Sequence, residues 1–332
     1  MIKEEVIIIG AGPCGLSTAI ELQRKGFEPL ILEKNNVANS IFHYPTHQTF
    51  FSSSEKLEVG DFPFISERQK PQRNEALTYY RMVAERSKVR IQSYETVTNV
   101  SEVNGEYLVH SETDKGKENI YSAKYVVFAT GYYGQPNELD VEGENLPHVS
   151  HYFKEAHPFF NQDVVIVGGK NSAVDAAIEL EKAGANVTVL YRGSEYSKSV
   201  KPWILPVFDS LVKNGKISML FDVSIEKITT ENVFYDQNGV KADIHADFVF
   251  AMIGYHPNKT FLMDLGVTID EESGRPYVNP DTMETNTNNI YISGVIAAGY
   301  NNNEIFIENG RYHGKLIADS IANKQEAGEV NG

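Results

Sequence analysis

Short apolar runs alternate with helical stretches along this chain, and the same alternation occurs twice. Val6–Ile9 and Asp163–Val167 read as strands, and each leads into a glycine turn and an Ala/Leu-rich helical stretch. A further apolar run follows in both places, at Pro29–Glu33 and Asn186–Leu190. Strands that alternate with helices are typical of parallel βαβ units. The two glycine turns lie 158 residues apart (168 − 10), so the pattern predicts an internal repeat and an α/β fold with two domains.

The remaining patterns predict the elements that complete these domains. We expect helices at 74–87, 173–183 and 304–322, strands at 89–91, 95–103, 107–111, 121–128 and 290–293, and a strand with a glycine ending at 248–258. Asp114–Gly116 predicts a hairpin turn. Ile41–Ser54 is rich in aromatic, His and Ser/Thr residues, which favours an ordered loop over a ligand. A packing loop fits its individual residues equally well.

The first glycine turn has the residues that a dinucleotide site needs. Gly10 permits the tight turn out of the strand, Gly12 lets a pyrophosphate approach the backbone, and Gly15 lets helix and strand pack closely. The helix N-terminus directs free N–H groups at the phosphates. Glu33 follows Gly15 by 18 residues (33 − 15) and ends the second strand, where it can accept a ribose hydroxyl. An acid there favours NAD or FAD over NADP.

The second turn differs from the first in a way that predicts a different nucleotide. The two turns align in the pairs Gly168 with Gly10, Lys170 with Gly12, and Ala173 with Gly15. Tyr191 stands where the acid stood, Arg192 comes next, and Lys198 and Lys201 follow. A cationic cluster at this position accommodates a ribose 2′-phosphate, so the second nucleotide should be NADPH. A surface arginine at a strand end is the plainer interpretation of Arg192. The Cβ of Lys170 would crowd the pyrophosphate unless its ammonium pairs with it.

Composition narrows the function classes. The formal net charge of −15 disfavours nucleic acid and anionic membranes as partners. The chain has no apolar run of membrane-spanning length and no visible signal peptide, so we expect a cytoplasmic protein. A single cysteine excludes an internal disulfide, a CxxC redox pair and a multi-cysteine metal site. The nine histidines show no metal-ligand spacing, so we expect no metal.

One acidic and one basic dinucleotide site in the same chain suggest an electron path from NADPH to a second bound cofactor, most simply FAD. The two repeats, together with Ala129–Gly131 and Gly254–Asn258, resemble the flavoproteins around thioredoxin reductase. Two departures stand out. Residues 149–157, where that family has its CxxC, contain no cysteine, and Tyr300 replaces the aspartate that usually follows the Ala-Gly turn.

The chain is more similar to the bacillithiol disulfide reductase (YpdA-type) family, through Gly10–Gly15, His43–Pro45 and Gly168–Ala173. This resemblance implies FAD at the first site, NADPH at the second, reduction of an oxidised low-molecular-weight thiol in thiol redox homeostasis, and a homo-oligomer. We therefore expect two Rossmann-like domains, with the NADPH domain inserted into a discontinuous FAD domain. The bounds we predict are 1–150 and 281–332 for FAD, 160–256 for NADPH, and 151–159 and 257–280 for hinges.

The candidate site residues follow from these motifs. For FAD they are Gly10, Gly12, Pro13, Cys14, Gly15, Glu33, Lys34, His43, Gln48, Val97 at the adenine edge, Thr130, Gly131, Ala298 and Gly299. For NADPH they are Gly168, Lys170, Asn171, Ser172, Ala173, Arg192, Lys198 and Lys201, although the last two lysines fit a solvated basic surface equally well. The Ala298–Gly299 turn and the N-terminus of the last helix are expected to approach the isoalloxazine ring.

Cys14 has two interpretations. A helix N-terminus lowers a thiol pKa, so Cys14 beside a flavin is a candidate catalytic residue that forms a mixed disulfide with the substrate. Against this, a pyrophosphate opposes thiolate formation, and burial under FAD would block the substrate. Two other functions remain open. The segment Phe128–Tyr132 is similar to a flavin monooxygenase signature, and a redox-sensing flavoprotein without turnover would share all of these motifs.

Overall fold

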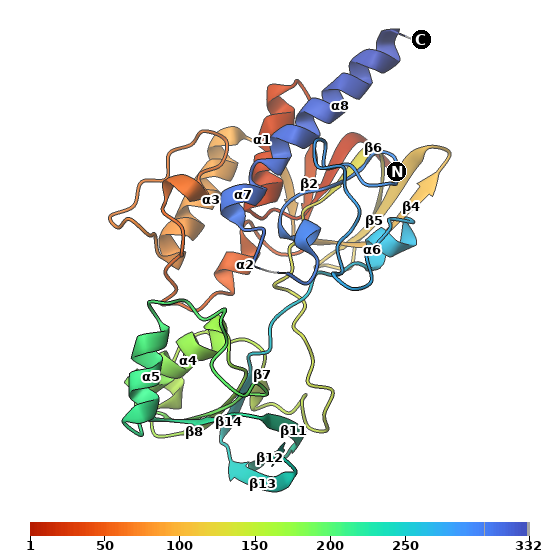
Figure 1. Cartoon of the computed structure of the whole chain (residues 1–332). Helices are drawn as coiled ribbons and strands as arrows, with labels where there is room; N and C mark the ends of the chain where they lie inside the picture. Colours follow the sequence, from red (N-terminus) through yellow and green to blue (C-terminus); the bar gives the residue numbers. More distant parts are fainter. Residues whose placement is uncertain (302, 331–332) are drawn as a thin grey trace. The chain divides into compact units, whose positions relative to one another are not determined.

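The computed structural model describes residues 1–301 and 303–330, and the chain divides into two compact units (Figure 1). The first unit consists of Met1–Phe42, Gln48–Gln135 and the chain from His256 onward. The second unit consists of Pro136–Tyr255 together with the short segment His43–His47. The chain therefore passes between the units at four points, after residues 42, 47, 135 and 255.

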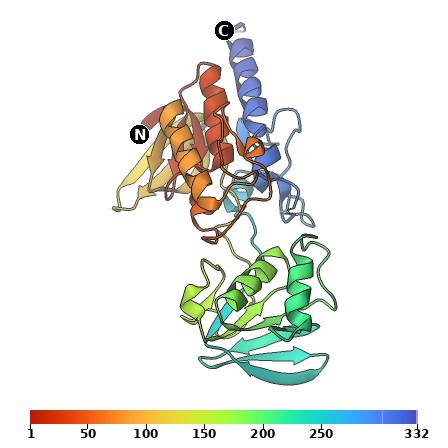
Figure 2. The same cartoon turned by 90° about the vertical axis from the view of Figure 1, so that its left-hand side faces the viewer.

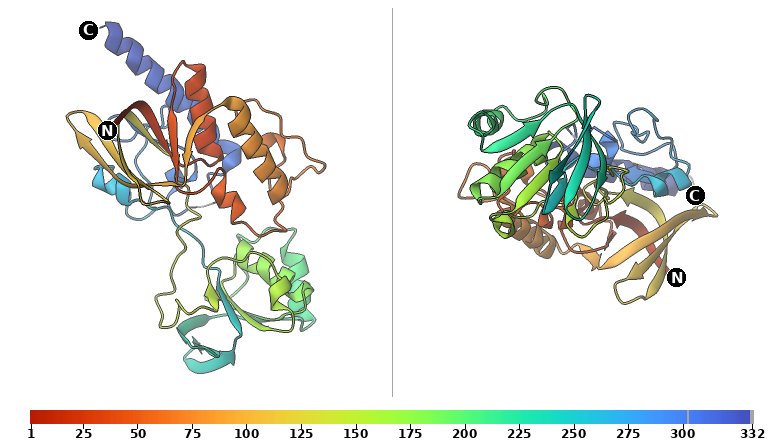
Figure 3. Two further views of the ribbon diagram at one scale, coloured as in Figure 1. Left: turned by 180° about the vertical axis from the view of Figure 1, so that it is seen from behind. Right: turned by 90° about the horizontal axis from the view of Figure 1, so that it is seen from below.

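The first unit is built on a sheet in which parallel and antiparallel strands meet. The strands are β1 (Ile2–Ile9), β2 (Leu30–Glu33), β3 (Arg90–Ser93), β4 (Glu95–Val103), β5 (Glu106–Thr113), β6 (Glu118–Phe128) and β15 (Ile290–Ile292). Their order is β3-β2-β1-β6-β5-β4, and β15 pairs with β6. β6 is parallel to β1 and β15 but antiparallel to β5, so the ribbon β4–β6 extends the parallel sheet (Figure 3). Val6–Ile9 and all of β2 are buried, as expected for parallel strands covered on both faces.

Helices cover this sheet and bring the end of the chain back to its beginning. They are α1 (Pro13–Arg24), α2 (Asn39–Phe42), α3 (Arg73–Ser87), α6 (Thr260–Asp264), α7 (Ile307–Gly310) and α8 (His313–Val330), with the 3₁₀ turns η1 (Glu55–Leu57) and η3 (Val295–Ala298). α8 lies along α1 (Figures 1 and 2). A Cβ on Gly314 would lie 2.8 Å from the backbone of Thr18, so a glycine is needed for this close approach. Lys25 pairs with Asp319 at 2.6 Å across the same two helices.

The second unit is a parallel sheet between a helical layer and a small antiparallel sheet. The parallel strands, in the order β10-β9-β8-β14-β7, are β10 (Ile217–Leu220), β9 (Asn186–Leu190), β8 (Asp163–Val167), β14 (Phe248–Ala251) and β7 (Val149–Ser150). α4 (Asn171–Lys182) and α5 (Leu205–Lys213) cover one face, and β11 (Val223–Ile228), β12 (Asn232–Gln237) and β13 (Val240–His245) cover the other (Figure 2). A further 3₁₀ turn is η2 (His157–Phe159). Successive residues of β8 enter different cores, Ile166 with the helices and Val167 with the antiparallel sheet.

The structure confirms both predicted βαβ repeats and the α/β class. The strands predicted at 95–103, 163–167 and 186–190 have the observed bounds. The long helix predicted at 304–322 was wrong, because the chain forms α7, leaves the helix at Arg311 and Tyr312, and then forms α8 as far as Val330. Arg311 accounts for the break, since its guanidinium donates to the carbonyl oxygens of Glu55 and Glu58 in the η1 region.

The compact units have other bounds than the predicted domains. Residues 136–150 lie in the second unit, where β7 pairs with β14, and residues 257–280 lie in the first. The crossings at residues 135 and 255 therefore differ from the predicted hinges, 151–159 and 257–280. Pro136, directly after the first of these crossings, forms a β-bridge with Tyr255, directly before the second, so the first and last residues of the segment 136–255 lie together. Within the described residues, no helix has both the length and the apolar character that crossing a membrane requires.

Candidate functional site

The carboxyl ends of the parallel strands in the first unit gather most of the predicted FAD residues. Gly10 follows β1, Glu33 ends β2, Ala129–Gly131 follow β6, and Gly294 follows β15 closely. These strands are mutually parallel, so their carboxyl ends share one edge of the sheet. Ligands of open α/β sheets bind at this edge.

The three glycines of the first turn are required for different reasons. Gly10 has φ +110°, and a Cβ on it would lie 2.5 Å from the carbonyl oxygen of Ala129. A Cβ on Gly15 would lie 2.0 Å from the carbonyl oxygen of Gly10. A Cβ on Gly12 would meet no atom within 4 Å. Packing within the chain therefore explains Gly10 and Gly15, whereas Gly12 leaves open space at the N-terminus of α1. A pyrophosphate fits that space.

Glu33 is buried and holds the glycine turn as well as ending its strand. Its Oε2 accepts the N–H of Ala11 at 2.8 Å, and its Oε1 accepts the N–H of Asn35 at 2.9 Å. Sequence reasoning missed these two bonds. A carboxylate has about four lone-pair positions, so both oxygens keep capacity for a ribose hydroxyl. The neighbouring Lys34 is exposed and extends toward Gly134, whose Cβ position lies 3.0 Å from the lysine Nζ.

Cys14 lies in the first turn of α1, but its environment differs from the expected one. Its sulfur packs between two glycines, because a Cβ on Gly294 would lie 2.9 Å from Sγ and a Cβ on Gly310 would lie 3.1 Å from it. Burial raises the pKa of the Cys14 thiol to about 12. The expected lowering of this pKa by the helix N-terminus was therefore wrong, because desolvation in this contact favours the neutral thiol.

Beyond the end of β15, Gly294 contacts His313, the first residue of α8, and sequence reasoning missed this pair. Gly294 has φ +84°, and its N–H donates to Nδ1 of His313 at 3.1 Å. Burial lowers the pKa of His313 to about 4, so its ring is neutral and can accept this bond. Ala298 is fully buried, and a Cβ on Gly299 would lie 2.3 Å from the carbonyl oxygen of Ser273. Close packing therefore accounts for the small residues of the Ala298–Gly299 turn, and the approach of this turn to the flavin ring stays a prediction.

The other predicted FAD residues have more varied surroundings. Pro13 is the first residue of α1, and Val97 is buried in β4. Thr130 is exposed, and Gly131 has φ +66° with open space at its Cβ position, as at Gly12. These two residues are therefore accessible at the shared edge.

Two predicted FAD residues, Gln48 and His43, come from the aromatic loop and belong to different units. The side-chain amide of Gln48 donates to the carbonyl oxygen of Thr49 at 2.9 Å, which occupies it locally. His43 is exposed and belongs to the segment that clusters with the second unit, whereas Gln48 belongs to the first. Their contacts with FAD remain predictions.

The second glycine turn lies at the carboxyl end of β8 and begins α4. Gly168 has φ +139°, and a Cβ on it would lie 2.4 Å from the carbonyl oxygen of Met252, just as Gly10 approaches Ala129. Ala173 is fully buried in the position of Gly15. Lys170 and Ser172 are exposed, so their side chains are accessible to a ligand at the helix N-terminus.

Asn171 organises the loop that carries the predicted basic residues. Its Nδ2 donates to the carbonyl oxygen of Ser199 at 2.8 Å, and its Oδ1 accepts the N–H of Lys201 at 2.9 Å. Arg192 and Lys198 are exposed, and Lys201 is partly buried. Asn171, predicted to contact NADPH, therefore holds the loop that contains Lys198 and Lys201.

Tyr191 has a defined place that the sequence did not indicate. A Cβ on Gly169 would lie 2.4 Å from its ring, and a Cβ on Gly193 would lie 2.5 Å from it. The ring therefore lies against two glycines that no larger residue could replace without a shift. It packs on the turn at the position where the first unit has a carboxylate, which leaves Arg192 as the charged group at the end of β9.

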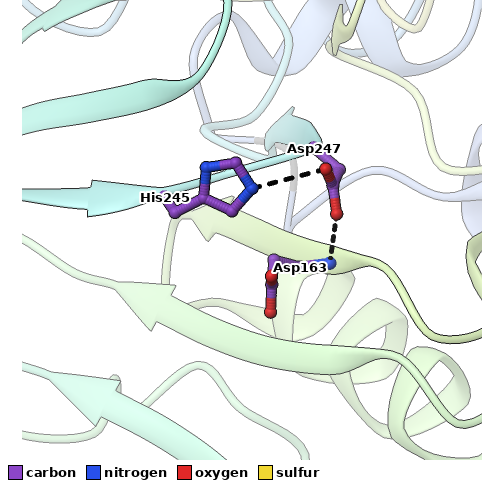
Figure 4. Close-up of side chains that lie close together, drawn as sticks. All are labelled: Asp163, His245 and Asp247. Atoms are coloured by element: carbon purple, nitrogen blue, oxygen red, sulfur yellow. Dashed lines mark hydrogen bonds and ion pairs between the residues drawn. The ribbon is translucent and has the colours of Figure 1, made fainter.

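Asp163, His245 and Asp247 form a cluster whose potential ligand atoms all lie within 4.8 Å of one another (Figure 4). His245 Nε2 lies 3.4 Å from Asp247 Oδ1, and Asp247 Oδ2 accepts the N–H of Asp163 at 2.8 Å. Asp163 also accepts from Asn186 at 3.1 Å. These bonds join the start of β8 to β9 and to the turn between β13 and β14, so the cluster has a sufficient structural role. Lys216 lines the adjoining cavity of about 300 Å³, which disfavours a cation there.

Comparison with known proteins identifies relatives over almost the whole chain. Residues 7–294 match the family described as pyridine nucleotide-disulphide oxidoreductase. Bacilliredoxin reductase Bdr of Bacillus subtilis (strain 168) is 57% identical over 327 residues, which cover 98% of this chain and 99% of the relative.

Solved structures agree with this relationship. Bacillithiol disulfide reductase Bdr from Bacillus cereus has 57% identity and a TM-score of 0.96, and covers 97% of this chain and 99% of its own. The Staphylococcus aureus protein of the same name has 55% identity and a TM-score of 0.93, over 98% of this chain and 100% of its own. Thioredoxin reductase from T. acidophilum, at 22% identity and a TM-score of 0.74, shares the fold, which is of the two-domain Rossmann type.

Proposed function

We propose a function for this chain on the basis that it belongs to the pyridine nucleotide-disulphide oxidoreductase family and is an oxidoreductase. It oxidises NADPH and reduces bacillithiol disulfide, a low-molecular-weight thiol disulfide, with FAD as its bound cofactor. The observation that carries this proposal is the 57% identity to the Bacillus cereus bacillithiol disulfide reductase over 97% of the chain. The reaction balances as NADPH, one proton and the disulfide giving NADP⁺ and two thiols.

The first unit is the proposed FAD site. The chemistry that FAD supplies when bound is two-electron transfer between NADPH and a disulfide. Gly12 and the N-terminus of α1 would receive the pyrophosphate, and Glu33 would accept the ribose hydroxyls. The open space at Gly12, which the chain itself does not use, is the observation that supports the fit. The same reasoning includes Gly131, where a Cβ would also meet nothing.

The second unit is the proposed NADPH site. Lys170 and Ser172 lie at the N-terminus of α4, where they can contact the pyrophosphate. Arg192, with Lys198 on the loop that Asn171 holds, supplies the positive charge for the 2′-phosphate. Tyr191 supplies no carboxylate to repel this phosphate. The preference for NADPH over NADH therefore resides in the exposed cations at the end of β9.

Cys14 is the candidate for a mixed disulfide with the substrate. Its sulfur packs against Gly294 and Gly310, and burial raises the pKa of its thiol, so this role requires a thiolate that these surroundings disfavour. If Cys14 does not react, the disulfide must receive its electrons from the cofactor directly. The two routes differ in whether a Cys14→Ser variant retains turnover.

A protein disulfide is the second candidate substrate. The Bacillus subtilis relative is named for bacilliredoxin, and its identity to this chain is also 57%. The monooxygenase alternative has less support, because the solved flavin-containing monooxygenase from Stenotrophomonas maltophilia, at 17% identity, shares the fold alone.

The test is NADPH consumption by the purified flavoprotein with bacillithiol disulfide, glutathione disulfide, cystine and an oxidised bacilliredoxin in parallel. We expect the fastest turnover with bacillithiol disulfide and release of two thiols per NADPH. Faster turnover with oxidised bacilliredoxin would make bacilliredoxin the proposed substrate in place of bacillithiol disulfide. If NADPH does not reduce the flavin, the proposed function is wrong. A long-lived oxygenated flavin spectrum would favour the monooxygenase, whereas reducible flavin without turnover on any disulfide would favour a redox sensor.

The homo-oligomer and the cytoplasmic location predicted from the sequence belong to this proposal. A single cysteine suits a reducing compartment, in which a bacillithiol reductase would act. Light scattering coupled to size-exclusion chromatography of the FAD-loaded protein measures the assembly. A monomer at micromolar concentration would exclude the homo-oligomer.

A further inference from the structure

Five residues of the aromatic loop, His43–His47, join the second unit although the residues on both sides belong to the first. We call this segment the strap. Phe42 precedes it and Gln48 follows it, so the strap accounts for two of the four chain passages between the units. The two passages are not needed to build a glycine turn or a strand of either sheet.

Arg73, the first residue of α3, anchors both ends of the strap to the first unit. Its Nη2 donates to the carbonyl oxygen of Phe42 at 2.5 Å, and its own N–H donates to the carbonyl oxygen of Gln48 at 2.9 Å. The guanidinium also lies 5.3 Å from the centre of the Phe42 ring. Arg73 is buried, and its Nε makes no hydrogen bond within the described residues. A buried cation is expensive, so this anchor is a costly feature of the fold.

Thr46 and His47 hold the strap on the second unit. The N–H of Thr46 donates to the carbonyl oxygen of Lys154 at 2.8 Å. His47 Nε2 lies 3.0 Å from Asp175 Oδ2, and its ring meets the edge of the Phe153 ring at 6.1 Å between centroids. Asp175 belongs to α4, the helix that begins at the second glycine turn. The strap therefore grips the helix whose N-terminus is the proposed pyrophosphate site.

We propose that His47 and Asp175 are positioning residues for electron transfer from NADPH, and that the strap restrains the second unit while the transfer occurs. The inference rests on the proposed function. His47 is followed directly by Gln48, so any reorientation of the second unit must either break the His47–Asp175 pair or carry the strap along. The pair acts through the position of α4 and contacts no reacting atom.

The restraint explains why the anchor and the grip occur together. A loop that only filled space would need neither the buried Arg73 that holds the residues flanking it nor the ion pair that His47 makes with Asp175. Partly buried pairs of this kind are stronger than fully exposed ones because solvent screens them less.

The experiment uses the FAD-loaded, full-length protein with His47→Ala, Asp175→Ala and the double variant. Rapid mixing with NADPH measures the rate constant of flavin reduction and its dependence on NADPH concentration. We expect each single variant to lower the limiting rate constant about fivefold, with the NADPH dissociation constant unchanged, and the double variant to show no further loss. His47→Gln, which keeps a donor for Asp175, should restore most of the rate.

Hydrogen–deuterium exchange supplies a readout that does not depend on activity. The Thr46 amide, held by Lys154, should exchange faster in His47→Ala, whereas the amides of Gly10–Gly15 should be unaffected. His245→Ala is the matched control, because it removes another His–Asp pair of the second unit that does not involve the strap. It should change neither the reduction rate nor the exchange of Thr46.

The outcomes separate the two proposals. If NADPH does not reduce the flavin of the natural protein, the proposed function fails, and the exchange data still test the strap. If the natural protein is reduced but single-variant rate constants match it, or if the losses multiply in the double variant, the positioning role is overturned. A raised NADPH dissociation constant with an unchanged limiting rate would equally overturn it, because it would assign the pair to binding.

Discussion

The two glycine turns share one backbone plan but differ where the two proposed nucleotides would bind. Gly10 and Gly168 both have positive φ, +110° and +139°, and both closely approach the residue that follows a neighbouring strand, Ala129 and Met252. The turns diverge where the ligand would lie. Gly12 faces open space, whereas Lys170 places an exposed ammonium there. Packing therefore accounts for the glycine that both turns share, while the proposed choice of nucleotide depends on the positions that face solvent.

The largest expected effect separates packing glycines from ligand glycines. Gly15→Ala places a Cβ 2.0 Å from a carbonyl oxygen, so we expect destabilisation of ~1–3 kcal/mol or failure to fold. Gly12→Ala meets no atom of the chain and should leave the melting temperature of the flavin-free protein unchanged while weakening FAD binding at least tenfold. Thermal unfolding and FAD titration measure both. Equal losses of stability in the two variants would contradict the distinction.

The second effect concerns the cations at the end of β9. Arg192→Ala should raise the KM for NADPH about tenfold or more, because the 2′-phosphate loses a charge-assisted partner, while the KM for NADH changes little. Steady-state kinetics with both coenzymes measure this split. Lys216→Ala, also in the second unit but on the cavity beside β10, is the control. An equal change for NADH and NADPH would assign Arg192 to general binding.

A smaller effect is expected at Asn171. Asn171→Ala removes two hydrogen bonds that hold the loop around Ser199 and Lys201, so the loop loses order while its charges remain. We expect a two- to fivefold increase in the KM for NADPH, which is smaller than the increase caused by Arg192→Ala. The increase itself should become smaller at high salt, because salt screens the charges of the loop. Ser172→Ala, next in the chain, tests whether a direct contact matters more. A loss larger than that of Arg192→Ala would assign Asn171 itself to the nucleotide.

The smallest effect is a pH dependence at the strap. Burial alone would lower the pKa of His47, but the hydrogen bond and charge of Asp175, assisted by Glu179 and opposed by Lys182, raise it. Lys154 is the charged residue of the other segment that holds the strap. The ion pair is complete below the ordinary histidine pKa and is lost as pH rises through the raised value. Flavin reduction should therefore slow modestly, about twofold, above neutral pH in the natural protein. A His47→Gln variant that retained the same slope would contradict this.

Much of the site could be read from the sequence because it depends on local spacing. The glycine turns, Glu33 and Arg192 belong to continuous βαβ units, in which the position of each residue follows from its place in the repeat. The structure differs from the sequence predictions where distant segments meet. The pKa of the Cys14 thiol is raised rather than lowered, because Gly294 and Gly310, nearly three hundred residues away in the chain, pack against its sulfur. The last helix was predicted as one continuous element. In the structure it is interrupted at Arg311, whose side chain donates to the carbonyl oxygens of Glu55 and Glu58.

By itself the sequence determined the two α/β repeats, the order of their strands and helices, and the opposite charges at the ends of β2 and β9. These depend on apolar periodicity and on residue type at fixed offsets, which local sterics and burial dictate. The folded chain was needed to place Gly12 beside open space, to raise the pKa of the Cys14 thiol, to pack Tyr191 on two glycines, and to pair His47 with α4. The surroundings of Cys14 and His47 depend on contacts between residues far apart in the chain, and desolvation and packing set their outcome.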